Sequence, residues 1–224
     1  MQDSKPSGEQ AKKRRRLSPE AITEAAIRLA DAEGLEAVSI RRVAAELDAR
    51  AMSLYDHFAS KRDLLVSMHD AAVGEMLVSQ PLPEDWRAAV AVSARSMFAA
   101  YARHPWAIFV TVERPDPGPN SVKVAKQMAR GLATVPLEHG DVWQVQGIVN
   151  DYVLGYSFRT VGTVNPEDME AAIAASDVVE FPELAALADN LRARPSIERF
   201  ELGLQTVLDG VERRFGLGDL RGSS

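Results

Sequence analysis

Apolar residues recur at helical spacing over most of the chain beyond residue 18, and no useful stretch alternates with the two-residue period of a strand. The first helix is predicted to begin at Ser18-Pro19-Glu20, which supplies an N-cap hydroxyl, a proline suited to the first turn and an acidic residue. Gly34 is predicted to end this helix, because glycine readily adopts the positive φ common at helix C-termini. The pattern as a whole predicts an all-α fold.

Two short helices joined by a tight turn are predicted next. Ser39 can cap the first of them, whose apolar positions share one helical face: Ile40, Val43, Ala44 and Leu47. The pattern breaks at Asp48, a residue type that tolerates the left-handed conformation of such a turn. A second short helix is expected over about 50–56, and Ser60 then opens a longer helix over about 61–79.

The rest of the chain predicts a larger helical body. Its helices are expected over residues 84–103, 105–112, 120–135, 140–162, 167–176, 182–193 and 196–215. Proline-rich breaks such as 115–119 separate several of them. These patterns divide the chain into a disordered basic arm (1–17), a small helical domain (18–64), a larger helical domain (65–216) and a disordered tail (217–224).

The net charge of −6 conceals an uneven distribution along the chain. Residues 1–64 carry a net charge of +1, the remainder carries −7, and the basic residues gather in the run from Lys12 to Arg16. An acidic body behind a basic end is compatible with binding phosphates through that end only. The basic run would also serve as a solubilising tail, and the charge pattern does not choose between the two.

Several classes of protein are disfavoured by what the sequence lacks. The chain contains no cysteine, which excludes disulfides and thiolate metal sites and fits a cytoplasmic protein. No apolar run reaches the roughly 18 residues needed to cross a bilayer, so no membrane partner is expected. Neither a glycine-rich phosphate loop nor metal-ligand histidine spacing occurs, and His69, His104 and His139 are scattered. We therefore expect no enzyme activity, no cofactor and no metal site.

The helices predicted within residues 18–58 follow the pattern of a helix-turn-helix DNA-binding unit. Ala44 and Ala45 supply small side chains where the two short helices would cross. The run from Ser39 to Phe58, followed by Ser60-Lys61-Arg62-Asp63-Leu64-Leu65, resembles the DNA-binding signature of the TetR family of transcription regulators. Asp48 stands where that family usually has glycine. The rest of the chain is similar in layout to the helical regulatory domain of the tetracycline-repressor branch.

This resemblance implies that the second short helix enters the major groove of a double-stranded DNA operator. The residues implied to contact phosphates or base edges are Ser39, Arg41, Arg50, Ala51, Met52, Ser53, Tyr55, His57 and Lys61. Arginine can bind guanine through two hydrogen bonds, and hydroxyl and imidazole groups can donate to phosphate. The alternatives are that Tyr55 is a core aromatic and that His57 is an ordinary surface residue.

The resemblance also implies a cavity for an unknown small-molecule effector in the larger domain. We select Met97, Tyr101, Trp143 and Tyr152 as its residues, with filling of the helical core as the alternative role. The tetracycline branch binds a drug–magnesium complex through a histidine and a threonine just before an Arg-Pro pair. Val110 and Glu113 stand at those places in this chain, so we expect no tetracycline–magnesium binding of that kind.

A homodimer is expected because one helix-turn-helix reads too few base pairs to find a single genomic site. The resemblance implies an interface formed by about 140–162 and 196–215, where Gly147, Gly155 and Gly203 would allow close approach. The predicted function is a repressor released by an effector that moves helix 61–79 and so changes the spacing of the recognition helices. An activator or ligand-independent regulator remains open, as does an enzyme or carrier with an N-terminal interaction module.

Overall fold

The computed structural model describes residues 17–113, 117–162 and 196–218, and all regular elements in these ranges are helices. The chain forms two compact units, one ending at Leu64 and the other beginning at Leu65. The predicted all-α fold is therefore confirmed. The basic arm before Leu17 and the helices predicted over 167–176 and 182–193 lie outside the described residues. Within the described ranges, no helix is long and apolar enough to span a membrane.

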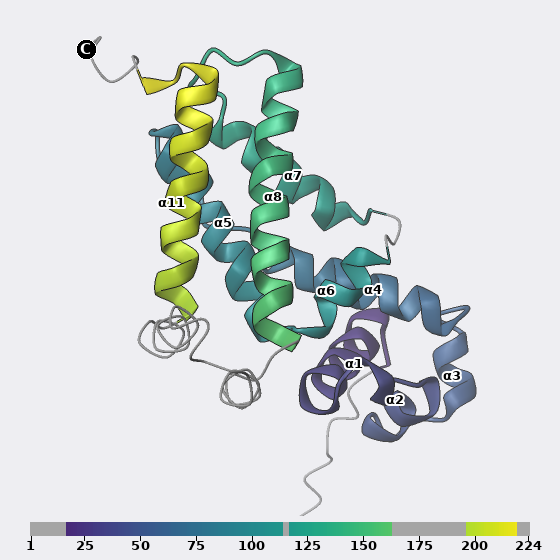
Figure 1. Cartoon of the computed structure of the whole chain (residues 1–224). Coiled ribbons are helices and arrows are strands. Elements are labelled where there is room, and N and C mark those ends of the chain that lie inside the picture. Colours follow the sequence, from purple (N-terminus) through teal and green to yellow (C-terminus); the bar gives the residue numbers. More distant parts are fainter. Residues whose placement is uncertain (1–16, 114–116, 163–195, 219–224) are drawn as a thin grey trace, which may run out of the picture. The chain divides into compact units, whose positions relative to one another are not determined.

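The N-terminal unit contains α1 (Pro19–Glu33), α2 (Ile40–Glu46) and α3 (Ala51–Tyr55), which Figure 1 labels, and the short 3-10 helix η1 (Leu35–Ala37). The predicted start of α1 is confirmed, because the Ser18 hydroxyl accepts a hydrogen bond of 3.2 Å from the Ala21 amide. Gly34 ends α1 with a φ of 85°, and its amide donates to the Ala30 carbonyl. The sequence pattern had not indicated η1.

The turn between α2 and α3 takes the predicted left-handed conformation. Asp48 has a φ of 50°, and its amide donates to the Ala45 carbonyl. Val43 and Leu54 are fully buried on the two sides of this turn, which fixes the packing of α2 against α3. Ala44 is buried as expected at the crossing, whereas Ala45 is exposed.

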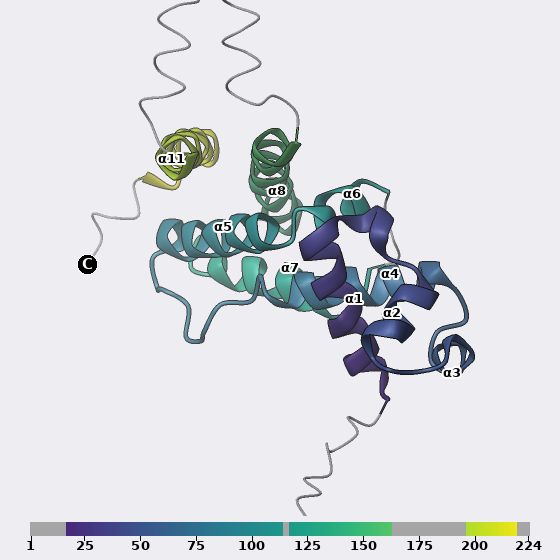
Figure 2. The same cartoon turned by 90° about the horizontal axis from the view of Figure 1, so that it is seen from below.

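The second unit is an assembly of helices that includes the two longest described, α8 and α11 (Figures 1 and 2). They are α4 (Lys61–Gly74), which begins in the N-terminal unit, α5 (Trp86–Arg103), α6 (Trp106–Val112), α7 (Pro119–Gly131), α8 (His139–Gly162) and α11 (Ser196–Phe215). Helix α5 packs against α7, α8 and α11. In Figure 2, α8 and α11 lie together along one side of α5.

Three predicted boundaries are wrong. Helix α4 ends at Gly74 rather than at 79, and the Val78 amide donates instead to the Gln127 side-chain carbonyl on α7. Helix α7 ends at Gly131, four residues before the predicted end. The predicted tail begins at 217, yet Leu217 is buried and its amide donates to the Glu212 carbonyl. After α4 and after α11, contacts with other parts of the fold therefore determine the structure: Val78 is bound by Gln127, and Leu217 is buried.

Aromatic packing and ion pairs join α5 to α8 and α11. The Phe98 ring of α5 stacks on the Phe200 ring of α11 with centroids 4.3 Å apart, and Tyr156 of α8 meets Phe200 at 5.4 Å. Arg95 donates to both carboxylate oxygens of Glu201 at 2.6 and 2.8 Å, a bidentate pair of fixed geometry. These contacts fix the positions of three helices relative to one another.

The conformation of Asp48 predicts how two substitutions differ in stability. Asp48→Gly should preserve or slightly raise the free energy of unfolding, because glycine adopts a φ near 50° without steric cost. Asp48→Val removes the same charge but adds a β-branched side chain, so it should be less stable than Asp48→Gly by about 1–2 kcal/mol. Chemical denaturation of both variants measures this difference, and equal stabilities would contradict the role assigned to the turn.

Candidate DNA-binding surface and effector cavity

Helix α3 buries one residue and exposes two large ones. Leu54 is fully buried, whereas the side chains of Met52 and Tyr55 are 73% and 48% exposed. Met52 and Tyr55 are three residues apart, so they share one helical face directed to solvent. The exposure of Tyr55 disfavours its alternative role as a core aromatic. An apolar side chain and a hydroxyl on one open face suit contacts with base edges and phosphates.

The other predicted DNA contacts lie in or next to α2, α3 and the start of α4, all in the N-terminal unit. Exposed members of this group are Arg41, Arg50, His57 and Lys61, and half-buried members are Ser39, Ala51 and Ser53. Ser39 also caps α2, because its hydroxyl accepts a hydrogen bond of 3.3 Å from the Arg42 amide. Arg42 itself pairs with Glu33 of α1 at 2.6 Å, so its guanidinium is bound within the unit.

A cavity of about 190 Å³ lies in the second unit, between α4, α5, α6, α7 and α8. Two of the four predicted effector residues, Met97 and Tyr101 of α5, line it. The structure does not bring the other two to it. Trp143 is 72% exposed on α8, and the Tyr152 hydroxyl donates a 2.7 Å hydrogen bond to the Phe200 carbonyl. Burial, and after it the neighbouring Tyr156, raise the pKa of Tyr152 to about 12.

Most of the cavity lining was not selected from the sequence. The additional lining residues are His69, Val73, Met76, Thr111, Ser121, Val124, Ala125, Met128, Gln146 and Asn150. A sequence signal existed for α4, because His69, Val73 and Met76 recur at helical spacing. The contributions of α6, α7 and α8 depend on how these helices pack, which local periodicity does not encode.

Thr111 lies at the centre of a hydrogen-bonded cluster in this cavity. Its hydroxyl donates to the Ala107 carbonyl at 2.9 Å, one turn earlier in α6. The same oxygen is 2.8 Å from His69 Nε2 and 3.4 Å from the Tyr101 hydroxyl. Burial lowers the pKa of His69, against the opposing charge of Asp70, and this favours a neutral imidazole. Burial likewise raises the pKa of Tyr101, so the phenol stays protonated at neutral pH.

Helices α4 and α7 approach each other closely beside the cavity. Asp70 accepts a hydrogen bond of 2.9 Å from the Asn120 amide, and the Asn120 side chain donates to the Asp70 carbonyl at 3.0 Å. A side chain at Gly118 would overlap the Asp70 carboxylate, and one at Gly74 would crowd Asn120. We call this pairing of Asp70 with Asn120 the α4–α7 latch.

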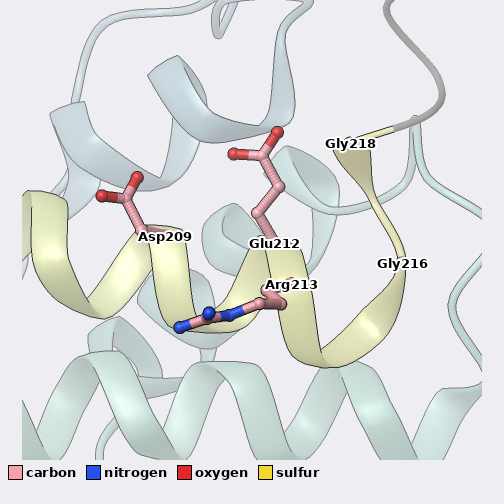
Figure 3. A pocket seen from close by; sticks show the side chains of 5 residues that line it. All are labelled: Asp209, Glu212, Arg213, Gly216 and Gly218. Carbon is pink, nitrogen blue, oxygen red and sulfur yellow. The ribbon is translucent and has the colours of Figure 1, made fainter.

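A second, more open hollow of about 400 Å³ borders the end of α11. Figure 3 shows Asp209, Glu212 and Arg213 on the helix, with Gly216 and Gly218 on the turn that follows. The Glu212 carboxylate forms an ion pair with Arg87 of α5 at 2.8 Å, and this pair joins α11 to α5. Among the described residues, no group of three metal-binding side chains is assembled here or elsewhere.

Comparison with known families identifies the two units. The family described as "Bacterial regulatory proteins, tetR family" matches residues 22–68, and "Tetracyclin repressor-like, C-terminal domain" matches residues 80–215. The chain belongs to the TetR family. It is therefore a DNA-binding transcription regulator with an N-terminal helix-turn-helix and a helical C-terminal domain.

Individual TetR-family proteins are similar over most of the chain. The HTH-type transcriptional repressor DrrR1 of Streptomyces coeruleorubidus is 32% identical over 210 residues, which cover 88% of this chain and 77% of that protein. The class A tetracycline repressor from transposon 1721 of Escherichia coli is 29% identical over 89% of this chain and 92% of its own. The structure of ActR from Streptomyces coelicolor in complex with actinorhodin has a TM-score of 0.73, with 26% identity over 90% of this chain and 99% of ActR.

The position of Lys61 at the start of α4 generates a prediction for DNA binding. Lys61→Ala should weaken operator binding and reduce the slope of log K against log salt concentration by about 1, because one phosphate contact is lost. Fluorescence anisotropy with a duplex from the upstream region of the protein's own gene, over a range of salt concentrations, measures both quantities.

Lys126→Ala supplies the matched control, because Lys126 is an exposed lysine on α7 of the other unit. Its salt slope should equal that of the unmodified protein. If Lys61→Ala leaves the slope unchanged as well, Lys61 makes no phosphate contact.

Proposed function

We propose that this protein is a homodimeric repressor whose binding to operator DNA is released by a small molecule held in the 190 Å³ cavity. The observation that carries the proposal is the course of α4. This helix starts at Lys61 in the N-terminal unit and supplies His69 and Val73 to the cavity wall. A ligand that favours one position of α4 over another thereby changes the spacing of the recognition helices in a dimer.

Known relatives support the proposal without naming the effector. DrrR1 is named a repressor, and ActR has been crystallised with actinorhodin, a small molecule. The cavity of this chain contains Met97 and Tyr101, two of the effector contacts expected from the sequence. An activator with the same architecture is the second candidate, since promoter geometry rather than protein structure sets the direction of control.

The Thr111 cluster does not favour an enzyme. A catalytic threonine would give its proton to a neighbouring base. Here the Thr111 hydroxyl has the Ala107 carbonyl as an acceptor at 2.9 Å, which leaves its oxygen free to accept from a His69 protonated at Nε2. We therefore propose that the protein is a regulator rather than a hydrolase. Because it binds DNA, we propose that it acts in the cytoplasm, where bacterial DNA lies.

The α4–α7 latch supports a route from the cavity to α4. Asp70 stands between the cavity residues His69 and Val73 on α4, and Asn120 immediately precedes the cavity residue Ser121 on α7. A ligand that separates α4 from α7 must therefore stretch the two hydrogen bonds of the latch. In the absence of ligand, the latch restricts α4, which preorganises the dimer for its operator.

Disruption of the latch should weaken operator binding although neither residue belongs to the DNA-binding unit. Asp70→Ala and Asn120→Ala are each expected to raise the operator dissociation constant about three- to tenfold, because α4 then occupies more positions. The double variant should bind more weakly than either single one. Asp70→Ala removes the bond from the Asn120 backbone amide, whereas Asn120→Ala removes the bond to the Asp70 carbonyl.

Anisotropy titrations at constant salt measure these affinities, with Lys126→Ala as the control on α7. Circular dichroism must show that each variant remains folded. Folded variants that bind the operator as tightly as the unmodified protein would show that the latch does not position α4.

The proposed dimer would use the outer faces of α8 and α11. These helices lie side by side in Figures 1 and 2, and each exposes large apolar residues: Trp143, Ile148 and Phe158 on α8, and Ile197 and Leu202 on α11. A Cβ added at Gly147 or Gly155 would meet no atom within 4 Å, so both glycines leave the α8 surface open to close approach. Gly203 differs, because Tyr152 of the same chain occupies the space above it.

Placing a charge on this face should separate the subunits. Leu202→Glu is expected to convert the dimer to a monomer at micromolar concentration, because an unpaired carboxylate would be buried in an apolar interface. Val122→Glu changes an apolar residue of similar exposure on α7, at 47% compared with 57%, and should remain dimeric. Sedimentation equilibrium distinguishes the two states. A dimeric Leu202→Glu variant would contradict this interface.

A further inference from the structure

We infer that the ligand of the cavity is a compact, uncharged, ring-containing molecule that accepts a hydrogen bond from Tyr101. This inference deepens the proposed function and rests on it, because it specifies the chemistry of the effector. Three properties of the cavity carry it: the charge of its lining, the arrangement of protons in the Thr111 cluster, and its size.

The lining contains no acidic or basic side chain other than His69 among the described residues. Burial keeps His69 neutral by lowering its pKa. The nearby Asp70 carboxylate is engaged by the Asn120 amide. A charged ligand would therefore lose part of its hydration without gaining an opposite charge, which disfavours its binding.

The protons of the Thr111 cluster can be assigned from its contacts. Thr111 has a single hydroxyl proton, which goes to the Ala107 carbonyl, so its oxygen acts as acceptor toward both other partners. His69 Nε2 donates at 2.8 Å, a normal hydrogen-bond length. Tyr101 donates at 3.4 Å, which is long and weak. The Tyr101 hydroxyl can therefore donate to a ligand carbonyl in place of Thr111, and only a weak hydrogen bond is lost. Thr111 itself already has partners for its proton and for its oxygen.

The rest of the lining suits a flat apolar body. Met76, Met97 and Met128 contribute flexible thioethers, which adapt to ring edges, and Val73 and Val124 add aliphatic surface. The volume of about 190 Å³ is below the 300–1,000 Å³ typical of sites for drug-sized ligands. A ligand of about two fused rings with one carbonyl group matches these dimensions.

Three naphthalenes of matched shape test the inference. 2-Acetylnaphthalene carries a neutral carbonyl, 2-naphthoate replaces it with an anion of similar size, and 2-ethylnaphthalene has no acceptor. At pH 7.5 the ketone should bind at least tenfold more tightly than the naphthoate. It should bind about three- to tenfold more tightly than the hydrocarbon, the effect of one net hydrogen bond. Equilibrium dialysis of the full-length protein gives the three dissociation constants.

Tyr101→Phe isolates the proposed donor, because it removes the hydroxyl and leaves the ring in place. In this variant, the ketone and the hydrocarbon should bind equally, with the hydrocarbon constant unchanged within twofold. Tyr55→Phe makes the same change on exposed α3 and should retain the preference for the ketone.

Naphthoate binding as tight as that of the ketone would overturn the inference, as would failure of the ketone to bind at 1 mM. An unchanged ketone preference in Tyr101→Phe would also overturn it. Operator release is measured separately by adding the ketone to the protein–DNA complex. If the ketone binds with the expected selectivity but the DNA stays bound, the proposed release mechanism fails while the assigned ligand chemistry stands.

Discussion

Helix α4 has to bury one face along its whole length, and this constraint organises the molecule. Leu64 and Met68 are fully buried, and Ala72 is 1% exposed. The helix starts at Lys61, in the unit that ends at Leu64, and its later turns supply His69 and Val73 to the cavity wall. A helix held in this way cannot change position without repacking buried side chains, and packed interiors favour discrete alternatives over gradual deformation.

The second unit combines a rigid part with an adaptable one. On one side of α5, stacked rings and the bidentate Arg95–Glu201 pair fix α8 and α11. At the cavity, which α8 also lines, there are methionines and two longer contacts of 3.4 Å, from Tyr101 to Thr111 and from Gln146 to the Ala125 carbonyl. The rigid side suits a subunit interface and the adaptable side suits a ligand. The α4–α7 latch lies on the adaptable side, where a ligand can act on it.

The DNA-binding unit was largely predictable from the sequence because its determinants are local. The cap at Ser18, the stop at Gly34 and the turn at Asp48 each depend on residues within one helical turn. Ala45 is an exception. It was expected at the crossing of α2 and α3 but is exposed, because the way in which two helices cross is not a local property. The cavity was predicted less well, because most of its lining residues were not selected. Tyr101 was selected and lines it, whereas Trp143 was selected but is exposed to solvent.

The sequence by itself determined the all-α class, the helix-turn-helix and its exposed α3 side chains, because helical periodicity, capping residues and turn preferences are short-range effects. Only the tertiary structure decided which residues share the cavity. His69 and Thr111 are 42 positions apart, and their contact exists because α4 and α6 both border the cavity. The same is true of Asp70 and Asn120, which are 50 positions apart. Contacts of this kind arise from the burial of several helical faces at once, which no local pattern specifies.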